Sequence, residues 1–112
     1  MQPKVLKYIL DIESAIQEIE WIKEKCSFDY DQFASDIIFQ RAVERDLEII
    51  GEAIRKMIEL DSLIYISSAK NIIGLRNIIA HAYDSVDPQL LWGIIMKNIP
   101  ILGQELKELK SN

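Results

Sequence analysis

The sequence of 112 residues has a single cysteine, Cys26, and a single histidine, His81. One cysteine excludes an internal disulfide bond and a zinc site built from several cysteines, and one histidine excludes a multi-histidine metal cage within one chain. No apolar run reaches the roughly 18 residues of a membrane span, and Lys7, Asp11 and Glu13 interrupt the apolar stretch that a signal peptide needs. We therefore expect a cytoplasmic protein with no membrane partner.

Basic residues are in the minority, because thirteen Lys or Arg face eighteen Asp or Glu and the net charge is −5. This balance argues against indiscriminate binding to nucleic acid, which needs a field of positive charge. The charge is unevenly distributed, however. Residues 62–83 contain no Asp or Glu, and the basic residues there are Lys70, Arg76 and His81. An anionic ligand would be least repelled in this acid-free segment.

Length and composition predict one globular domain over residues 1–112, since nearly half of the residues are apolar and 28% are charged. Apolar residues recur every three or four positions along most of the chain, which is typical of amphipathic helices. The first helix is expected to begin near Pro3, with Glu13, Glu18, Glu20, Lys23 and Glu24 on its solvent side. Its core stripe is Val5, Ile9, Ile12, Ile16, Ile19 and Ile22. A second stripe is Phe39, Val43, Leu47, Ile50, Ile54 and Met57.

Local signals mark where the helices begin and end. Asp29 or Asp31 can cap the helix that carries the second stripe, which spans about 30 residues or is split into two. Gly51 lies inside that helix, so close packing against a neighbour is its best justification. Ser67 or Ser68 can cap a third helix, covering roughly residues 69–82.

A fourth helix is expected to start with Asp87 as N-cap and Pro88 as its first residue. Its apolar stripe is Leu91, Ile95, Ile99, Leu102, Leu106 and Leu109. Pro100 must kink or break this helix, because proline removes a hydrogen-bond donor and clashes with the preceding turn. Taken together, these signals predict an all-α, up-and-down bundle of four to five helices.

The expected third helix contains the candidate catalytic residues. On a helical wheel its core face contains Ile72, Leu75, Ile78, Ile79 and Ala82. A second face contains Arg76, Asn77, Ala80 and His81, and Tyr83 falls beside Arg76 if the helix continues that far. The small residues Gly74 and Ala80 allow a backbone or a ligand to approach closely.

An imidazole and a guanidinium on one face suit the cleavage of RNA. His81 can exchange a proton near neutral pH, and Arg76 can stabilise negative charge on a phosphate. RNA supplies its own nucleophile, the ribose 2′-hydroxyl, so no metal or other cofactor is required. DNA is not an expected partner. One chain has a single imidazole, so acid and base roles could be shared across a homodimer. The same two residues could equally be surface charges.

Three stretches of the sequence resemble HepT-like proteins of the HEPN superfamily. Residues 74–83, GLRNIIAHAY, are similar to the family's Arg-x4-His-x-Tyr signature, and residues 47–53, LEIIGEA, are similar to its E-x-x-G-E-A helix. Residues 86–92, VDPQLLW, and 98–100, NIP, resemble two elements that follow the signature. The matches come in the family's order and cover most of residues 40–102.

The resemblance implies an α-helical homodimer that acts as the endoribonuclease toxin of a toxin–antitoxin pair. It implies catalysis by Arg76 and His81 at a cleft along the dimer interface, without metal. It also implies a partner, a minimal nucleotidyltransferase antitoxin, that silences the toxin by transferring AMP to Tyr83. An anionic nucleotide beside Arg76 and His81 would compete with RNA. Asn77 is assigned a supporting role, orienting the imidazole or the RNA.

Two alternative interpretations stay open. One is a non-catalytic module in which the same cationic face binds a nucleotide or the transferase. The other is a purely structural helical dimerisation unit whose polar face is merely solvated. His81 discriminates between catalysis and binding, because binding tolerates its loss more readily than proton transfer does.

Overall fold

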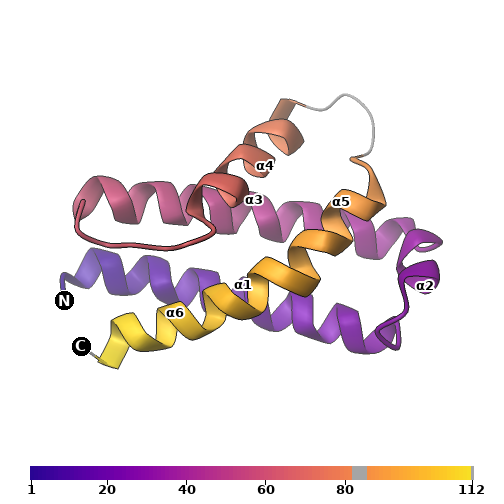
Figure 1. Ribbon diagram of the computed structural model, residues 1–112, viewed down its shortest axis with the longest axis horizontal. Helices are drawn as coiled ribbons and strands as arrows, with labels where there is room; N and C mark the ends of the chain where they lie inside the picture. The colour runs from indigo at the N-terminus through magenta and orange to yellow at the C-terminus, as the bar shows by residue number, and fades with distance from the viewer. Residues whose placement is uncertain (82–85, 112) are drawn as a thin grey trace.

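The computed structural model describes residues 1–81 and 86–111, and within these residues every regular element is helical (Figure 1). This confirms the all-α prediction. The elements are α1 (Pro3–Lys25), α2 (Tyr30–Ala34), α3 (Ile37–Leu60), α4 (Ala69–His81), α5 (Pro88–Gly93), the π-helical η1 (Ile94–Asn98) and α6 (Ile99–Ser111). None of these helices combines the length and the apolar character that a membrane crossing requires.

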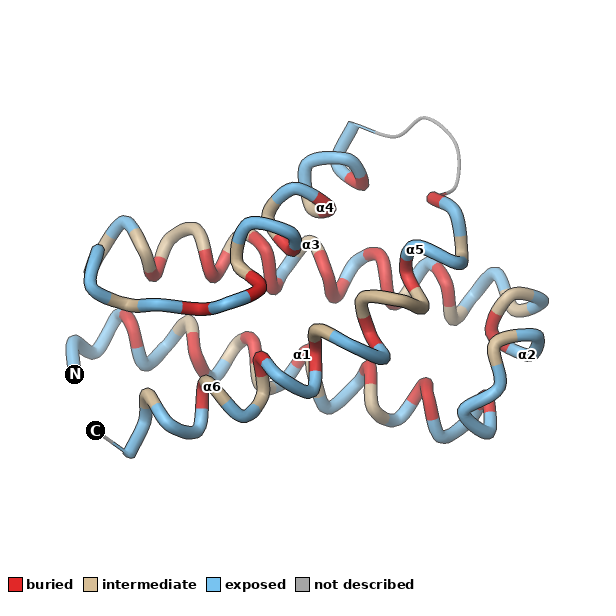
Figure 2. Tube along the Cα trace, viewed as in Figure 1, coloured by how far each residue is buried: buried red, intermediate tan, exposed pale blue. Residues whose placement is uncertain are grey.

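The two long helices α1 and α3 lie side by side in opposite directions, and the continuous helical column α5–η1–α6 crosses them (Figure 1). Helix α4 packs against α3. The buried residues face the space between these helices, as Figure 2 shows in red. The predicted stripes of α1, α3 and α5–α6 therefore form the core. Only residues at their margins, Ile16, Phe39 and Leu109, are partly exposed.

The predicted second helix is split in two, and each part has its own aspartate cap. A side-chain oxygen of Asp29 accepts a hydrogen bond from the N–H of Asp31 at the start of α2, and Asp36 accepts one from the N–H of Phe39 at the start of α3. Asp87 caps α5 in the same way, with Pro88 as the first helical residue, as predicted. These caps satisfy N–H groups that a helix leaves free at its first turn.

The hydroxyl groups of the two serines predicted to cap α4 make hydrogen bonds to other helices. The hydroxyl of Ser67 donates a hydrogen bond to Glu105 of α6, and the hydroxyl of Ser68 accepts one from the side-chain amide of Asn98 in η1. These serine side chains therefore hold the beginning of α4 against the C-terminal helices. Ser68 does occupy the predicted N-cap position, because α4 begins at Ala69 and the carbonyl of Ser68 accepts from the N–H of Ile72. Its hydroxyl, however, bonds to η1 and not to the first turn of α4.

Pro100 is the second residue of α6, so it does not break the helix there, and the π-helical segment ends two residues before it. In the wider register of η1 the N–H of Ile99 donates to the carbonyl of Ile94, five residues earlier. The carbonyl of Ile95 would need an N–H from residue 100, which proline lacks. Instead, the ammonium of Lys23 lies 3.3 Å from this carbonyl oxygen. Lys23 is only 4% exposed, so its predicted place on the solvent side of α1 was wrong.

A buried acid lies at the contact between α1 and α3. Asp46 of α3 is 5% exposed, and it lines one small groove together with Glu18 of α1. Burial raises the pKa of the Asp46 carboxyl to about 8, and the hydrogen bond and negative charge of Glu18 act in the same direction. Asp46 is therefore mostly protonated at neutral pH, and a neutral carboxyl can donate its proton to Glu18.

Candidate active site

The site begins with a close crossing of α3 and α4. A methyl group on Gly51 of α3 would lie 2.6 Å from Cβ of Arg76 and 3.3 Å from the backbone carbonyl oxygen of Ile72. Both distances are shorter than ordinary van der Waals contact. Any side chain at residue 51 would therefore push α4 away from α3. This confirms that Gly51 is present because a neighbour packs closely against it, and the neighbour is Arg76.

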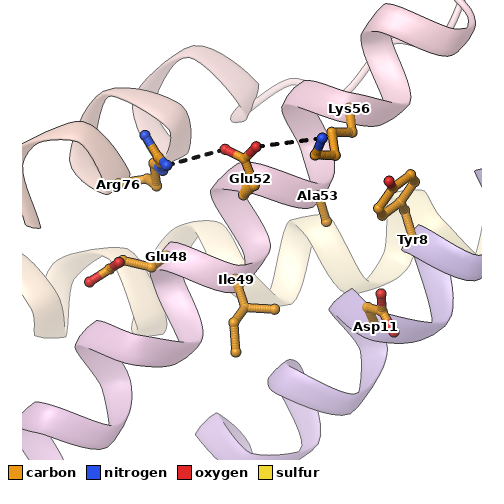
Figure 3. A pocket seen from close by; sticks show the side chains of 8 residues that line it. All are labelled: Tyr8, Asp11, Glu48, Ile49, Glu52, Ala53, Lys56 and Arg76. Atoms are coloured by element: carbon orange, nitrogen blue, oxygen red, sulfur yellow. Dashed lines mark ion pairs between the residues drawn. The ribbon is translucent and has the colours of Figure 1, made fainter. Parts of the chain in front are cut away.

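The guanidinium of Arg76 is held at both ends. Its Nη2 lies 3.3 Å from Oε2 of Glu52 on α3 (Figure 3). Its Nη1 donates a hydrogen bond of 3.0 Å to the side-chain oxygen of Asn77. The Arg76 side chain is 32% exposed, so part of it faces solvent. The two contacts restrict the plane of the guanidinium and leave a charged edge accessible.

Glu52 is the centre of a small network of charges. Besides Arg76 it accepts hydrogen bonds from Arg55, the shorter at 2.6 Å, and lies 4.0 Å from Lys56. The hydrogen bond from Arg55 is the main reason why the pKa of the Glu52 carboxyl is lowered, and the positive charges of Arg55, Arg76 and Lys56 lower it further. Glu52 is therefore ionised across the neutral range and stays attractive to Arg76.

A cavity of about 370 Å³ lies between α1 and α3 beside Arg76 (Figure 3). The carboxylates of Asp11, Glu48 and Glu52 line it together with Lys56 and Arg76. Three acids against two bases make this cavity a poor place for a phosphate. An anion that contacted Arg76 would therefore approach its accessible edge from the outer surface of α4.

His81 is the last residue of α4 and is exposed, like Asn77 and Ala80. Residues five apart on an α-helix differ in direction by about 140°, so Arg76 faces α3 while His81 faces well away from it. Among the described residues no hydrogen bond joins His81 to Arg76 or to Asn77. The amide of Asn77 thus orients Arg76, whereas the sequence interpretation had linked it to His81 or the RNA.

The predicted core face of α4 is partly wrong. Ile72, Leu75 and Ile79 are buried, but Ile78 is 55% exposed. The wheel placed Ile78 at the edge of the apolar arc, and the neighbouring helices cover only the centre of that arc. Ala82, the fifth residue of this face, and Tyr83, the predicted modification site, lie outside the described residues.

Glu52 is a site residue that reasoning from α4 alone did not identify. It belongs to the LEIIGEA segment, and it follows directly after the glycine that receives Arg76. The acid-free segment, residues 62–83, was the signal in the sequence that could have predicted a partner for Arg76 on another helix. A half-buried arginine needs a counter-charge, and residues 62–83 cannot supply one. In the part of the chain that the structure describes, no three His, Cys, Asp or Glu side chains form a cluster that could hold a metal ion.

Comparison with known proteins gives a consistent set of matches. A family model described as "Ribonuclease HepT-like" matches residues 12–109. "Putative RNase MJ1380" of Methanocaldococcus jannaschii is 38% identical over 106 residues, which cover 92% of this chain and 94% of that protein. "Putative RNase TTE0752" of Caldanaerobacter subterraneus subsp. tengcongensis is 33% identical, covering 88% of this chain and 89% of its own length.

"Probable ribonuclease HepT" of Thermococcus cleftensis is 32% identical over 105 residues, which cover 92% of this chain and 93% of that protein. No solved structure gives a significant match. The matches therefore extend over nearly the whole chain, from α1 to α6.

Proposed function

The chain belongs to the HepT-like ribonuclease family, and we propose that it is an endoribonuclease that cleaves RNA without a metal ion. The observation that carries the proposal is the family match over residues 12–109, which includes α3 and α4 in full. That range contains Glu52, Arg76, Asn77 and His81. The closely packed, counter-charged Arg76 supports a role as a fixed binding group for a phosphate.

Three polar residues of α4, Arg76, Asn77 and His81, have roles in this reaction. The ribose 2′-hydroxyl attacks the adjacent phosphorus, and the bond from phosphorus to the 5′-oxygen of the next nucleotide breaks. His81 transfers a proton as general acid or base, and Arg76 stabilises the negative charge that develops on the phosphate oxygens. Asn77 keeps the guanidinium in orientation through its 3.0 Å hydrogen bond.

A homodimer explains how Arg76 and His81 act on one phosphate. Within one chain the two side chains face different directions around α4, and a second chain related by a two-fold axis can place its His81 near the Arg76 of the first. Light scattering or sedimentation measures this directly. A protein that cleaves RNA but stays monomeric at high concentration would contradict the shared site.

RNA cleavage in EDTA tests the proposed activity. Wild-type protein and His81→Ala, both prepared without a nucleotidyltransferase and both confirmed as folded and unmodified by circular dichroism and intact mass, are incubated with the same RNA. We expect cleavage by the wild type and a loss of at least about a hundredfold in the variant. Absence of cleavage by both proteins would favour the binding function below.

The role of Arg76 is tested by Arg76→Lys. Lysine keeps the positive charge but loses the planar pair of donors, so we expect slower cleavage. Undiminished cleavage would count against direct contact between the guanidinium and the phosphate.

We further propose that the protein is a toxin that a minimal nucleotidyltransferase antitoxin silences by transferring AMP to Tyr83. AMP carries a negative phosphate, which would compete with RNA for the cationic groups of α4. The test is intact-mass analysis after incubation with ATP and the partner transferase. Tyr83→Phe should gain no mass. A gain of mass by Tyr83→Phe would show another acceptor.

One observation favours a second candidate function. Because Arg76 and His81 diverge around α4, a single chain does not bring them together, and a monomer would only bind a nucleotide or the transferase. In that case His81→Ala would leave ligand binding nearly unchanged, whereas an Arg76 variant would lose it.

A further inference from the structure

A surface groove of about 470 Å³ lies between α4 and the segment formed by α5 and η1. Its walls are aliphatic, with contributions from Leu75 and from two exposed side chains, Ile78 at 55% and Leu90 at 43%. Its rim on α4 carries Lys70 and Asn71, and both are exposed. An apolar hollow with a polar rim is the kind of surface at which proteins bind ligands or partners.

Gly74 lies in this groove, and the packing of the chain does not require a glycine there. A methyl group on Gly74 would meet no atom of the described residues within 4 Å. Glycine in the middle of a helix destabilises it relative to alanine, because the free backbone loses more entropy on folding. What the glycine does provide is depth, since the groove extends to the backbone of α4. A flat ligand can therefore approach that backbone closely.

The charge of the groove favours an anionic ligand. Among the described residues that line it none is acidic, and residues 62–83 contain no Asp or Glu. Lys70 provides a positive charge at one side, and Asn71 provides both a donor and an acceptor. Aliphatic walls, an amide at the rim and a nearby cation together suit a nucleobase whose phosphate lies at Lys70.

The groove also lies on the same face of α4 as the histidine. Gly74 and His81 are seven residues apart, almost two helical turns, so they point in nearly the same direction at a separation of about 10 Å along the axis. This distance is larger than the spacing between neighbouring nucleotides, so a short stretch of an extended strand would span it. A base in the groove would thus belong to a nucleotide close to the one on which His81 acts.

We propose that the groove between α4 and α5 binds one nucleotide of the RNA substrate, with its base between Ile78 and Leu90 over Gly74 and its phosphate at Lys70. This inference rests on the proposed ribonuclease function and adds a subsite to it. Apolar contact with the base gives affinity for any sequence, while Asn71 can distinguish bases by their edges.

Binding of an uncleavable RNA tests the subsite separately from catalysis. The probe is a fluorescein-labelled 2′-O-methyl RNA hexamer of mixed sequence, which lacks the attacking hydroxyl, and the measurement is fluorescence anisotropy in EDTA. Gly74→Leu fills the groove from α4 with a strong helix former. We expect its Kd to be raised about tenfold over that of the wild type.

Gly103→Leu is the matched control. Gly103 also lies in a helix beside a surface groove, and a methyl group on it would meet no described atom within 4 Å. That groove is between α1 and α6, so we expect an unchanged Kd for the hexamer. Ile78→Ala provides a second test, because it removes an exposed wall without filling the groove or disturbing the core. A weaker Kd is expected for Ile78→Ala as well.

The outcomes separate the subsite from the proposed function. If the wild type cleaves RNA in EDTA but Gly74→Leu and Ile78→Ala bind the hexamer as tightly as the control, the subsite is wrong and the ribonuclease stands. If instead the wild type does not cleave RNA, the proposed ribonuclease function is wrong. If Gly74→Leu keeps its RNA affinity but has half the mass of the wild type in light scattering, the groove is a contact between two copies, which also overturns the subsite.

Discussion

Gly51 of α3 and Gly74 of α4 are both glycines in the middle of helices, and their surroundings differ completely. Cβ of Arg76 occupies the space where Gly51 would carry a side chain, whereas the space beside Gly74 holds no atom of the described residues within 4 Å. The first glycine is required by the contact between two helices of the same chain. The second is exposed at a groove with aliphatic walls and with no acid among its described lining residues.

This contrast shows that the two sides of α4 serve different purposes. The side facing α3 is closed by packing and by the ion pair between Arg76 and Glu52, so it determines where the guanidinium lies. The side with Gly74, Ile78 and His81 is open, so it is available to a ligand or a second chain. Mutations that disturb the packing on the closed side should therefore cost stability, whereas those on the open side should not.

The largest effect is expected at the closed contact. Gly51→Ala places a methyl group 3.3 Å from the backbone carbonyl of Ile72, which cannot move without displacing α4. We expect the free energy of unfolding to fall by up to about 3 kcal/mol, with RNA cleavage reduced more than tenfold because Arg76 is displaced. Urea denaturation and a cleavage assay measure the two effects. Gly103→Ala is the control, and equal stability of the two variants would contradict the close contact.

The next largest effect is expected at the buried carboxyl of Asp46, where α3 packs against α1. It is a dependence of the free energy of unfolding on pH. The pKa of Asp46 is about 8 in the folded protein, against an ordinary value near 4 in the unfolded chain. Between these values the folded protein binds more protons than the unfolded chain, so stability must decrease as the pH rises. We expect a loss of about 2 kcal/mol in the free energy of unfolding from pH 5 to pH 7.

Asp46→Asn should largely remove this pH dependence, because the amide can donate to Glu18 without titrating. Denaturant unfolding at several pH values is the measurement. A wild-type protein that is more stable at pH 7 than at pH 5, with the variant behaving identically, would show that Asp46 is ionised in the folded state.

Glu52→Gln separates the orientation of Arg76 from the stability of the fold. The neutral amide loses the attraction that holds the guanidinium, so we expect cleavage to fall about tenfold in kcat, with little change in KM. Stability should change by less than about 0.5 kcal/mol, because these ion pairs are partly exposed.

Glu59→Gln is the matched control for this change. Glu59 also pairs with Arg55, at 2.7 Å, but makes no contact with Arg76, so its cleavage rate should equal that of the wild type. A Glu52→Gln protein that cleaves faster than the wild type would show that Glu52 competes with the phosphate for Arg76.

The smallest effect is expected on the open side. Gly74→Ala adds a methyl group to open space and improves the helix propensity of α4, so we expect the free energy of unfolding to rise by about 0.5–1 kcal/mol. Thermal or urea unfolding measures the gain. A loss of stability would mean that Gly74 packs as tightly as Gly51, and the contrast between the two sides of α4 would be wrong.

Most of the fold could be predicted from the apolar periodicity. The stripes of α1 and α3 and the caps at Asp29 and Asp87 are local signals, and each depends on residues within about one or two turns. The helix is not broken at Pro100, which lies inside α6; the departure from α-helical geometry is the π-helical turn η1 just before it. The burial of Lys23 could not be predicted from such local signals. Its burial depends on the unpaired carbonyl of Ile95, which is 72 residues away and becomes available only because Pro100 follows a π-helical turn.

The candidate site was predictable to a smaller extent. The helical wheel correctly placed Arg76, Asn77, Ala80 and His81 outside the buried face, but it could not show that Arg76 turns towards Glu52 on another helix. It also placed Ile78 in the core. How wide an apolar arc is buried depends on how closely the neighbouring helices approach, and this is a property of the whole bundle.

The sequence by itself determined the all-helical class, the core stripes, the acid-free segment and the resemblance to the HepT-like family, because each of these is carried by residues close together along the chain. The tertiary structure alone decided the partner of Arg76, the reason for Gly51, the place of Lys23 and the open groove at Gly74. Those features arise where helices distant in the sequence meet, and the distances and charges at such contacts exist only once the chain is folded.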